Sequence, residues 1–127
     1  MEHITHSIVE DSLRKTKFDF SSTQKRLSFP VICRIYKKMK SGIKFSAIKV
    51  DEDLIIDGHH RYIASILAEL PIETAPSQKT SVTNVVDWSK VEIDSEDWDT
   101  EAKIKMLNAI DAEFNNTSFE KIDQLIK

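Results

Sequence analysis

One short run of side chains in this chain combines charge, ring nitrogens and a glycine: Asp57-Gly58-His59-His60-Arg61. An apolar stretch, residues 54–56, precedes it and predicts a short buried strand, while apolar residues recur at helical spacing after it. The run therefore predicts a strand, a tight turn and the start of a helix. Gly58 is one of only 2 glycines, which indicates a backbone conformation that a Cβ would obstruct.

Such a turn suits the capture of an anion. The first N–H groups of a helix have no partner within the helix and lie at the positive end of its dipole. Arg61 adds a planar fork that matches phosphate or carboxylate, and the imidazoles of His59 and His60 can donate to an oxyanion or carry a proton near neutral pH. We interpret the turn as a phosphate pocket.

Other interpretations of the same residues stand beside this one. His59 and His60 can decorate an ordinary helix start with Arg61 solvated, and Asp57 can cap the helix through its carboxylate. A metal site formed by Asp57 and the two histidines is disfavoured, because adjacent helical residues point in different directions. Since no HExxH or CxxC motif is present and Cys33 is the only thiol, we expect no zinc and no protein-held metal.

The elements around the turn follow from periodicity and from helix start and stop signals. Ser28 with Pro30 predicts a helix start, Gly42 predicts its left-handed stop, and Pro71 stops the helix that begins after Gly58. Strands are predicted at residues 4–9, 45–50, 54–57 and 72–74, with one or two more within 82–93. A polar loop is expected at 75–81, and Asp99 or Thr100 is expected to cap a late helix carrying Ile104, Leu107, Ile110 or Asp111, and Phe114.

Composition limits the class of protein. With 127 residues, 40% of them hydrophobic, the chain predicts a single domain over residues 1–127. The formal net charge of -3 disfavours a general duplex-DNA binder. A single cysteine excludes an internal disulfide, and no apolar stretch predicts a signal peptide or membrane span, so we expect a reducing cytoplasm.

Three landmarks resemble the ParB/sulfiredoxin-like superfamily. The stretch from Ile55 to Ala64 resembles its strand–turn–helix signature, the segment Gln24-Lys25-Arg26-Leu27-Ser28-Phe29 resembles its Q-x-R-x-x-F motif, and Gly42 falls where the family has a glycine before a strand. The resemblance implies an α+β domain (mixed α/β) with a small mixed sheet, a core of about 5–75 and a C-terminal helical extension of about 76–127. It also implies that this domain binds a nucleotide such as ATP, ADP or CTP, with or without Mg²⁺. It implies a site built from Gln24, Arg26, Gly58, His59, His60 and Arg61.

The resemblance also implies candidate catalytic residues. At some of these positions the chain differs from the family. Asp57 would position Mg²⁺ or accept a substrate proton, and the turn is similar to that of the family's free-serine kinases. The upstream glutamate of those kinases has Asp19 as its nearest counterpart here, and His59 replaces both the reactive cysteine of sulfiredoxins and the glutamate of the ParB signature. We list Asp57, His59 and Asp19 as candidate catalytic residues.

The sequence is compatible with three functions. The first is a small-molecule kinase or related phosphotransferase acting on a hydroxyl substrate. The second is a nucleotide-binding switch without turnover. The third is a DNA-associated, nuclease-like or protein-interaction module, which the net charge and the acidic C-terminal half disfavour.

Overall fold

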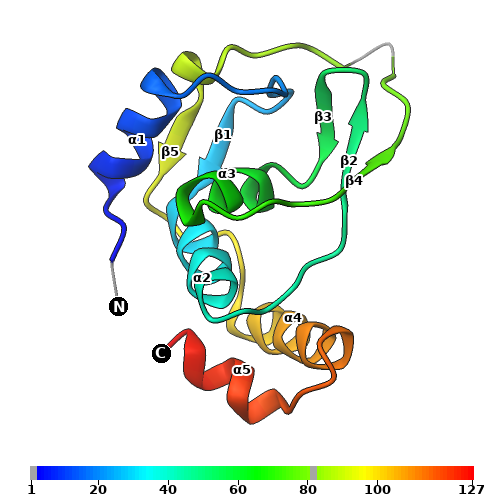
Figure 1. Cartoon of the computed structure of the whole chain (residues 1–127). Helices are drawn as coiled ribbons and strands as arrows, with labels where there is room; N and C mark the ends of the chain where they lie inside the picture. Colours follow the sequence, from blue (N-terminus) through cyan, green and yellow to red (C-terminus); the bar gives the residue numbers. More distant parts are fainter. Residues whose placement is uncertain (1–2, 81–82) are drawn as a thin grey trace.

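The computed structural model describes residues 3–80 and 83–127 and has an α+β fold (Figure 1). Residues 81 and 82, where the expected polar loop meets the expected late strands, lie outside the described residues. The helices are α1 (His6–Lys15), α2 (Phe29–Lys40), α3 (His59–Ala68), the short 3-10 helix η1 (Trp88–Lys90), α4 (Glu101–Phe114) and α5 (Phe119–Leu125). The strands are β1 (Arg26–Ser28), β2 (Ile48–Asp51), β3 (Leu54–Asp57), β4 (Thr74–Pro76) and β5 (Glu92–Asp94).

The first element is a helix, so the prediction of a strand at residues 4–9 is wrong. Thr5 caps α1, because its hydroxyl accepts a hydrogen bond from the backbone N–H of Ile8 at 3.2 Å. Val9 and Leu13, one turn apart, are the buried residues of α1. The apolar residues at positions 4, 8 and 9 are compatible with either a helix or a strand. The cap at Thr5 and the burial of Leu13 favour the helix.

The structure confirms the predicted helix that starts near Ser28 and the predicted strands that follow it. Ser28 is the N-cap residue of α2, Pro30 lies in the first helical turn, and Gly42 follows the helix with a φ of +92°. Strands β2 and β3 form an antiparallel hairpin, although β2 begins at Ile48 rather than at residue 45. Strand β4 pairs in parallel with β2 and lies two residues later than the predicted 72–74.

The strands form two small sheets instead of one. One sheet has the order β3-β2-β4, and the other pairs β1 with β5 in parallel, with Leu27 opposite Ile93. Trp88, Val91 and Ile93 belong to the same core cluster as the residues before position 75. The core therefore extends beyond the expected boundary near residue 75, and the segment up to β5 is part of the body of the domain.

Helices α4 and α5 lie at one end of the molecule, away from both sheets (Figure 1). Thr100 caps α4 as predicted, by accepting a hydrogen bond from the backbone N–H of Lys103. A second small apolar cluster of Ile43, Ala112 and Ile122 joins these helices to the body. Lys38 of α2 reinforces this joint through a 2.7 Å ion pair with Asp111.

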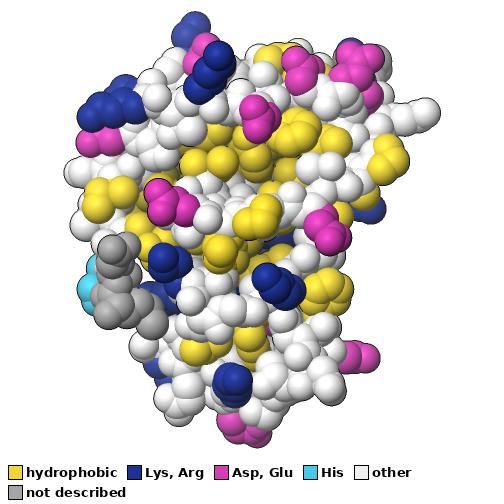
Figure 2. Space-filling model, viewed as in Figure 1, with side chains coloured by type: hydrophobic (Ala, Val, Ile, Leu, Met, Phe, Trp, Pro, Cys, Tyr) yellow, Lys and Arg dark blue, Asp and Glu magenta, His cyan; other side chains and the backbone are white. Residues whose placement is uncertain are grey.

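The surface carries both signs of charge. Lysine and arginine side chains alternate with aspartate and glutamate around a group of hydrophobic side chains in the upper centre of the face shown in Figure 2. Within the described ranges, the chain has no helix with the length and apolar content needed to cross a membrane.

Candidate functional site

The start of α3 is an open helix terminus preceded by a left-handed glycine. Gly58 is the N-cap residue with a φ of +101°, and no side chain among the described residues caps the helix. A Cβ on Gly58 would lie 2.6 Å from Cγ2 of Ile48 and 2.7 Å from Nη2 of Arg61. Glycine is thus required here both by its φ and by the two side chains packed against it. Because the N-cap residue is Gly58 and no side chain in the described ranges makes a capping hydrogen bond, the alternative in which Asp57 caps α3 through its carboxylate is wrong.

Arg61 lies beside this turn and is only weakly neutralised. Its Nη1 donates to the hydroxyl of Ser46 at 3.1 Å, and its Nη2 lies 3.9 Å from Oδ2 of Asp57. The side chain of Asp57 is 77% exposed, so solvent screens this long ion pair. The Nε of Arg61 is buried and has no hydrogen-bond partner in the described chain, while 22% of the side chain reaches the surface. Arg61 therefore retains donor capacity for an added anion.

His59 points into the body instead of towards the open turn. Its Nε2 accepts a hydrogen bond from the backbone N–H of Thr23 at 3.0 Å, and the residue is 2% exposed. Burial, followed by the neighbouring His60, lowers the pKa of His59 to about 4. A neutral ring that accepts at Nε2 carries its proton on Nδ1, which is buried without a partner among the described residues. His59 thus holds the segment before β1 and is neutral near pH 7.

His60 has the same role one residue later. Its Nε2 accepts a hydrogen bond from the backbone N–H of Ser28 at 2.9 Å, and its ring meets that of Trp98 edge to face at 5.3 Å. Burial lowers the pKa of His60 to about 4. Both imidazoles therefore connect α3 to the segment around β1 by hydrogen bonds. The Nε2 atoms that accept these bonds are not available to bind an oxyanion.

The other predicted site residues, Gln24, Arg26 and Asp19, make no contact with Arg61 through a hydrogen bond or ion pair in the described chain. Arg26 pairs with Asp94 of β5 at 2.9 Å, and the backbone N–H of Gln24 donates to the hydroxyl of Ser22. Asp19 is exposed on the segment between α1 and β1. The structure thus brings Asp57, Gly58 and Arg61 together, with the two histidines facing away from them.

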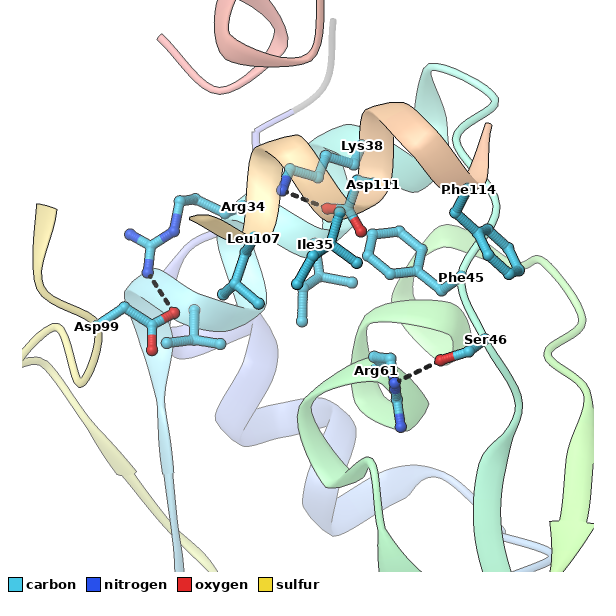
Figure 3. Close-up of a pocket in the computed structure, with 12 residues that line it drawn as sticks. Arg34, Ile35, Lys38, Phe45, Ser46, Arg61, Asp99, Leu107, Asp111 and Phe114 are labelled. Carbon is cyan, nitrogen blue, oxygen red and sulfur yellow. Dashed lines mark hydrogen bonds and ion pairs between the residues drawn. The ribbon is translucent and has the colours of Figure 1, made fainter. Parts of the chain in front are cut away.

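A cavity of about 230 Å³ adjoins Arg61 between α2, α3 and α4 (Figure 3). Its apolar walls are Val31, Ile35, Phe45, Leu107, Ile110 and Phe114. Arg34 and Lys38 also line it, but Arg34 bonds Asp97 and Asp99, and Lys38 bonds Asp111. The hydrogen bond from Arg34 holds the pKa of Asp97 below its usual value.

Sequence reasoning missed Arg34 and Lys38 as lining residues. Their spacing of one helical turn on α2 was the available signal. Carboxylates lie close to both of them, whereas the single carboxylate partner of Arg61, Asp57, is 3.9 Å away and 77% exposed, so Arg61 is the least neutralised of these three cations. The cavity thus combines apolar walls with one arginine near its edge.

Metal-binding capacity at the turn is limited to one carboxylate. No group of three or more His, Cys, Asp or Glu side chains in residues 3–80 and 83–127 converges in a way that could hold an ion. Mg²⁺ needs only one or two carboxylates when phosphate oxygens and water complete its shell. Asp57, exposed beside Arg61, fits that smaller requirement.

The fold and the turn define an α+β domain with an open helix terminus beside an arginine. Comparison with models of protein families, with curated proteins and with solved structures gives no match to this chain. The resemblance to the ParB/sulfiredoxin-like superfamily therefore stays a prediction that rests on the motifs alone.

Proposed function

We propose that this protein binds the phosphate group of a small molecule, with nucleotides as the first candidates, at the N-terminus of α3. The observation that carries the proposal is the partly exposed Arg61, whose buried Nε lacks a partner, beside a helix start that no side chain caps. An anion at this point would accept hydrogen bonds from the first backbone N–H groups of α3 and from the guanidinium at once.

The adjoining cavity limits how much of the ligand would be enclosed. Pockets that bury most of a small ligand have volumes of about 300–1,000 Å³, whereas this cavity has about 230 Å³. The volume suits a phosphate together with a small apolar group. The remainder of ATP, ADP or CTP would lie along the surface.

Phosphotransfer is the second candidate function, and it depends on Asp57. The buried His59, with a pKa of about 4 and an occupied Nε2, is a poor proton carrier near neutral pH. The exposed Asp57 would accept the proton of a substrate hydroxyl while that oxygen bonds to the terminal phosphorus and the bond to the departing nucleotide oxygen breaks. Bound Mg²⁺ would supply charge neutralisation between the carboxylate and the phosphates.

The proposal is tested by titrating ATP, ADP, CTP, AMP and inorganic phosphate, with and without Mg²⁺, by calorimetry. Arg61→Ala should weaken binding by about 10- to 100-fold, the scale of a lost charge-assisted hydrogen bond, with little change in melting temperature. Arg26→Ala distinguishes the site implied by the sequence motif from the site at the start of α3. Because Arg26 is paired with Asp94, its loss should change the affinity for phosphate little if the site at α3 is correct.

Arg14→Ala on α1 is a matched control for the loss of one surface arginine. Unchanged affinity in Arg61→Ala, or an equal loss in Arg14→Ala, would contradict the proposed site. Loss in Arg26→Ala alone would instead favour the site implied by the motif.

A further inference from the structure

The outward face of α4 is apolar at its centre. Asn108 and Ala112 are the buried residues of α4 and face the body. Met106 and Ile110 lie on the side of the helix opposite to Asn108 and Ala112 and are each 54% exposed, and Ile110 also lines the cavity between α2, α3 and α4. A helix that covers a domain on one side usually presents polar residues on the other. Two large apolar side chains at the centre of that face form a stripe against which another helix can pack.

The sequence of this face has the spacing of a helix-pairing seam. Lys103, Met106, Ile110 and Glu113 follow one another at intervals of three, four and three residues. This is the alternation that keeps one stripe of a helix against a partner helix. The stripe is apolar in its middle, positive at its N-terminal end and negative at its C-terminal end.

That charge order distinguishes the possible orientations of a second copy. In an antiparallel pair, Met106 of one copy faces Ile110 of the other, and each Lys103 meets a Glu113. A parallel pair would bring lysine to lysine and glutamate to glutamate, which is unfavourable.

We infer that α4 pairs antiparallel with α4 of a second copy of this chain, through Met106 and Ile110 with Lys103–Glu113 ion pairs at both ends. The helices α4 and α5 lie at one end of the molecule, where a second copy can approach without meeting the sheets (Figure 1). The inference does not require the proposed phosphate site, but the two share Ile110, which lines the cavity beside Arg61.

The association should be weak. The seam covers about three helical turns, well below the area of a standard stable interface. Exposed ion pairs add modestly to affinity and mainly select the orientation. We expect a dissociation constant on the order of 10⁻⁴ M.

Sedimentation equilibrium on the full chain, from about 10 µM to about 1 mM, tests the pairing. The parent should pass from monomer to dimer over this range, and Met106→Lys should remain monomeric. Ile8→Lys on α1 is the matched control, because Ile8 is also a surface isoleucine, 46% exposed, and lies on a different helix. A monomeric parent at the highest concentration, or a Met106→Lys variant that dimerises like the parent, would overturn the inference.

Charge reversal tests the orientation. Lys103→Glu places two glutamates against each other in the antiparallel pair, and Glu113→Lys places two lysines together. Each variant alone should therefore dimerise at least 5-fold more weakly than the parent. An equimolar mixture should recover association, because both ion pairs form between unlike copies.

Melting curves of each charge variant control for the Lys103–Asp99 contact within the chain. A mixture that associates no better than the separate variants would rule out the antiparallel register, even if the parent dimerises.

Discussion

Helices α3 and α4 begin in opposite ways. Thr100 closes the start of α4 with a side-chain hydrogen bond, and Glu101 follows in its first turn. The start of α3 has a left-handed Gly58, no capping side chain and no acidic residue in its first turn. A good cap stabilises a helix by about 1 kcal/mol. The chain thus forgoes that stabilisation at the one helix start that lies beside Arg61.

Contacts with the segment around β1 hold the first turn of α3 in the absence of a cap. His59 and His60 accept backbone hydrogen bonds from Thr23 and Ser28, so tertiary contacts fix the helix start although no side chain of the described residues caps it. Neutral imidazoles suit this position, because a positive charge at a helix N-terminus is unfavourable. The open end of α3 is therefore rigid as well as uncapped, which is the arrangement an anion site needs.

Acid should have the largest effect on this arrangement. Both histidines have a pKa of about 4 in the folded protein against 6.5 for an ordinary histidine. The unfolded chain binds protons first, so stability is fully present above pH 6.5 and is lost as pH falls towards 4. The loss should reach about 3 kcal/mol for each histidine. Urea melts between pH 7 and pH 4 measure it.

Glutamine substitutions separate the two contributions. His59→Gln and His60→Gln retain an acceptor and remove the titrating ring, so each should reduce the slope of stability against pH by about half. His3→Gln, at an exposed position, is the matched control and should keep the parent slope. Equal slopes in all variants would mean that these rings are not the groups that resist protonation.

The second largest loss of stability is expected when Gly58 or Gly42 is replaced by alanine. Gly58→Ala should cost about 2–4 kcal/mol, from the left-handed φ and from overlap with Ile48 and Arg61. Gly42→Ala should cost about 1 kcal/mol, because its φ is also positive but nothing lies within 4 Å of the new Cβ. Denaturant melts of the two variants test this order. Equal losses would show that crowding at Gly58 adds nothing to the backbone effect.

Local signals in the sequence identified the turn, and distant contacts decided what its side chains do. The strand before Gly58, the helix after it, and the roles of Gly42 and Thr100 follow from neighbouring residues, and the structure confirms them. The direction of His59 and His60 depends on Thr23 and Ser28, more than thirty positions earlier. No local pattern encodes that packing.

Two other differences have similar causes. Residues 4–9 contain apolar positions compatible with either period, and the burial of Val9 and Leu13 against the core favours the helix. Strand β1 is three residues long and pairs with β5, whose residues lie 66 positions later in the chain. A strand that short has too few positions to show alternation.

The smallest effect is expected at Asp57. Asp57→Asn should change the free energy of unfolding by less than about 0.5 kcal/mol, because the carboxylate is 77% exposed and does not cap α3. Thr100→Ala at the start of α4 is the contrasting variant and should cost about 1 kcal/mol through its lost cap. Chemical melts of both variants measure this difference, and a larger loss for Asp57→Asn would mean that its contact with Arg61 supports the fold.

Asp57→Asn also separates binding from chemistry at the proposed site. Removing one exposed negative charge beside a bound phosphate should strengthen binding of inorganic phosphate by about 3-fold at low salt, and less at high salt. If the carboxylate holds Mg²⁺ or takes the substrate proton, nucleotide affinity in the presence of Mg²⁺ should instead stay level or fall, and transfer to a hydroxyl substrate should cease. Calorimetry with phosphate and with ATP and Mg²⁺ distinguishes these results. Tighter binding of both ligands would identify the open end of α3 as a site for binding alone, because the carboxylate then acts only by repulsion.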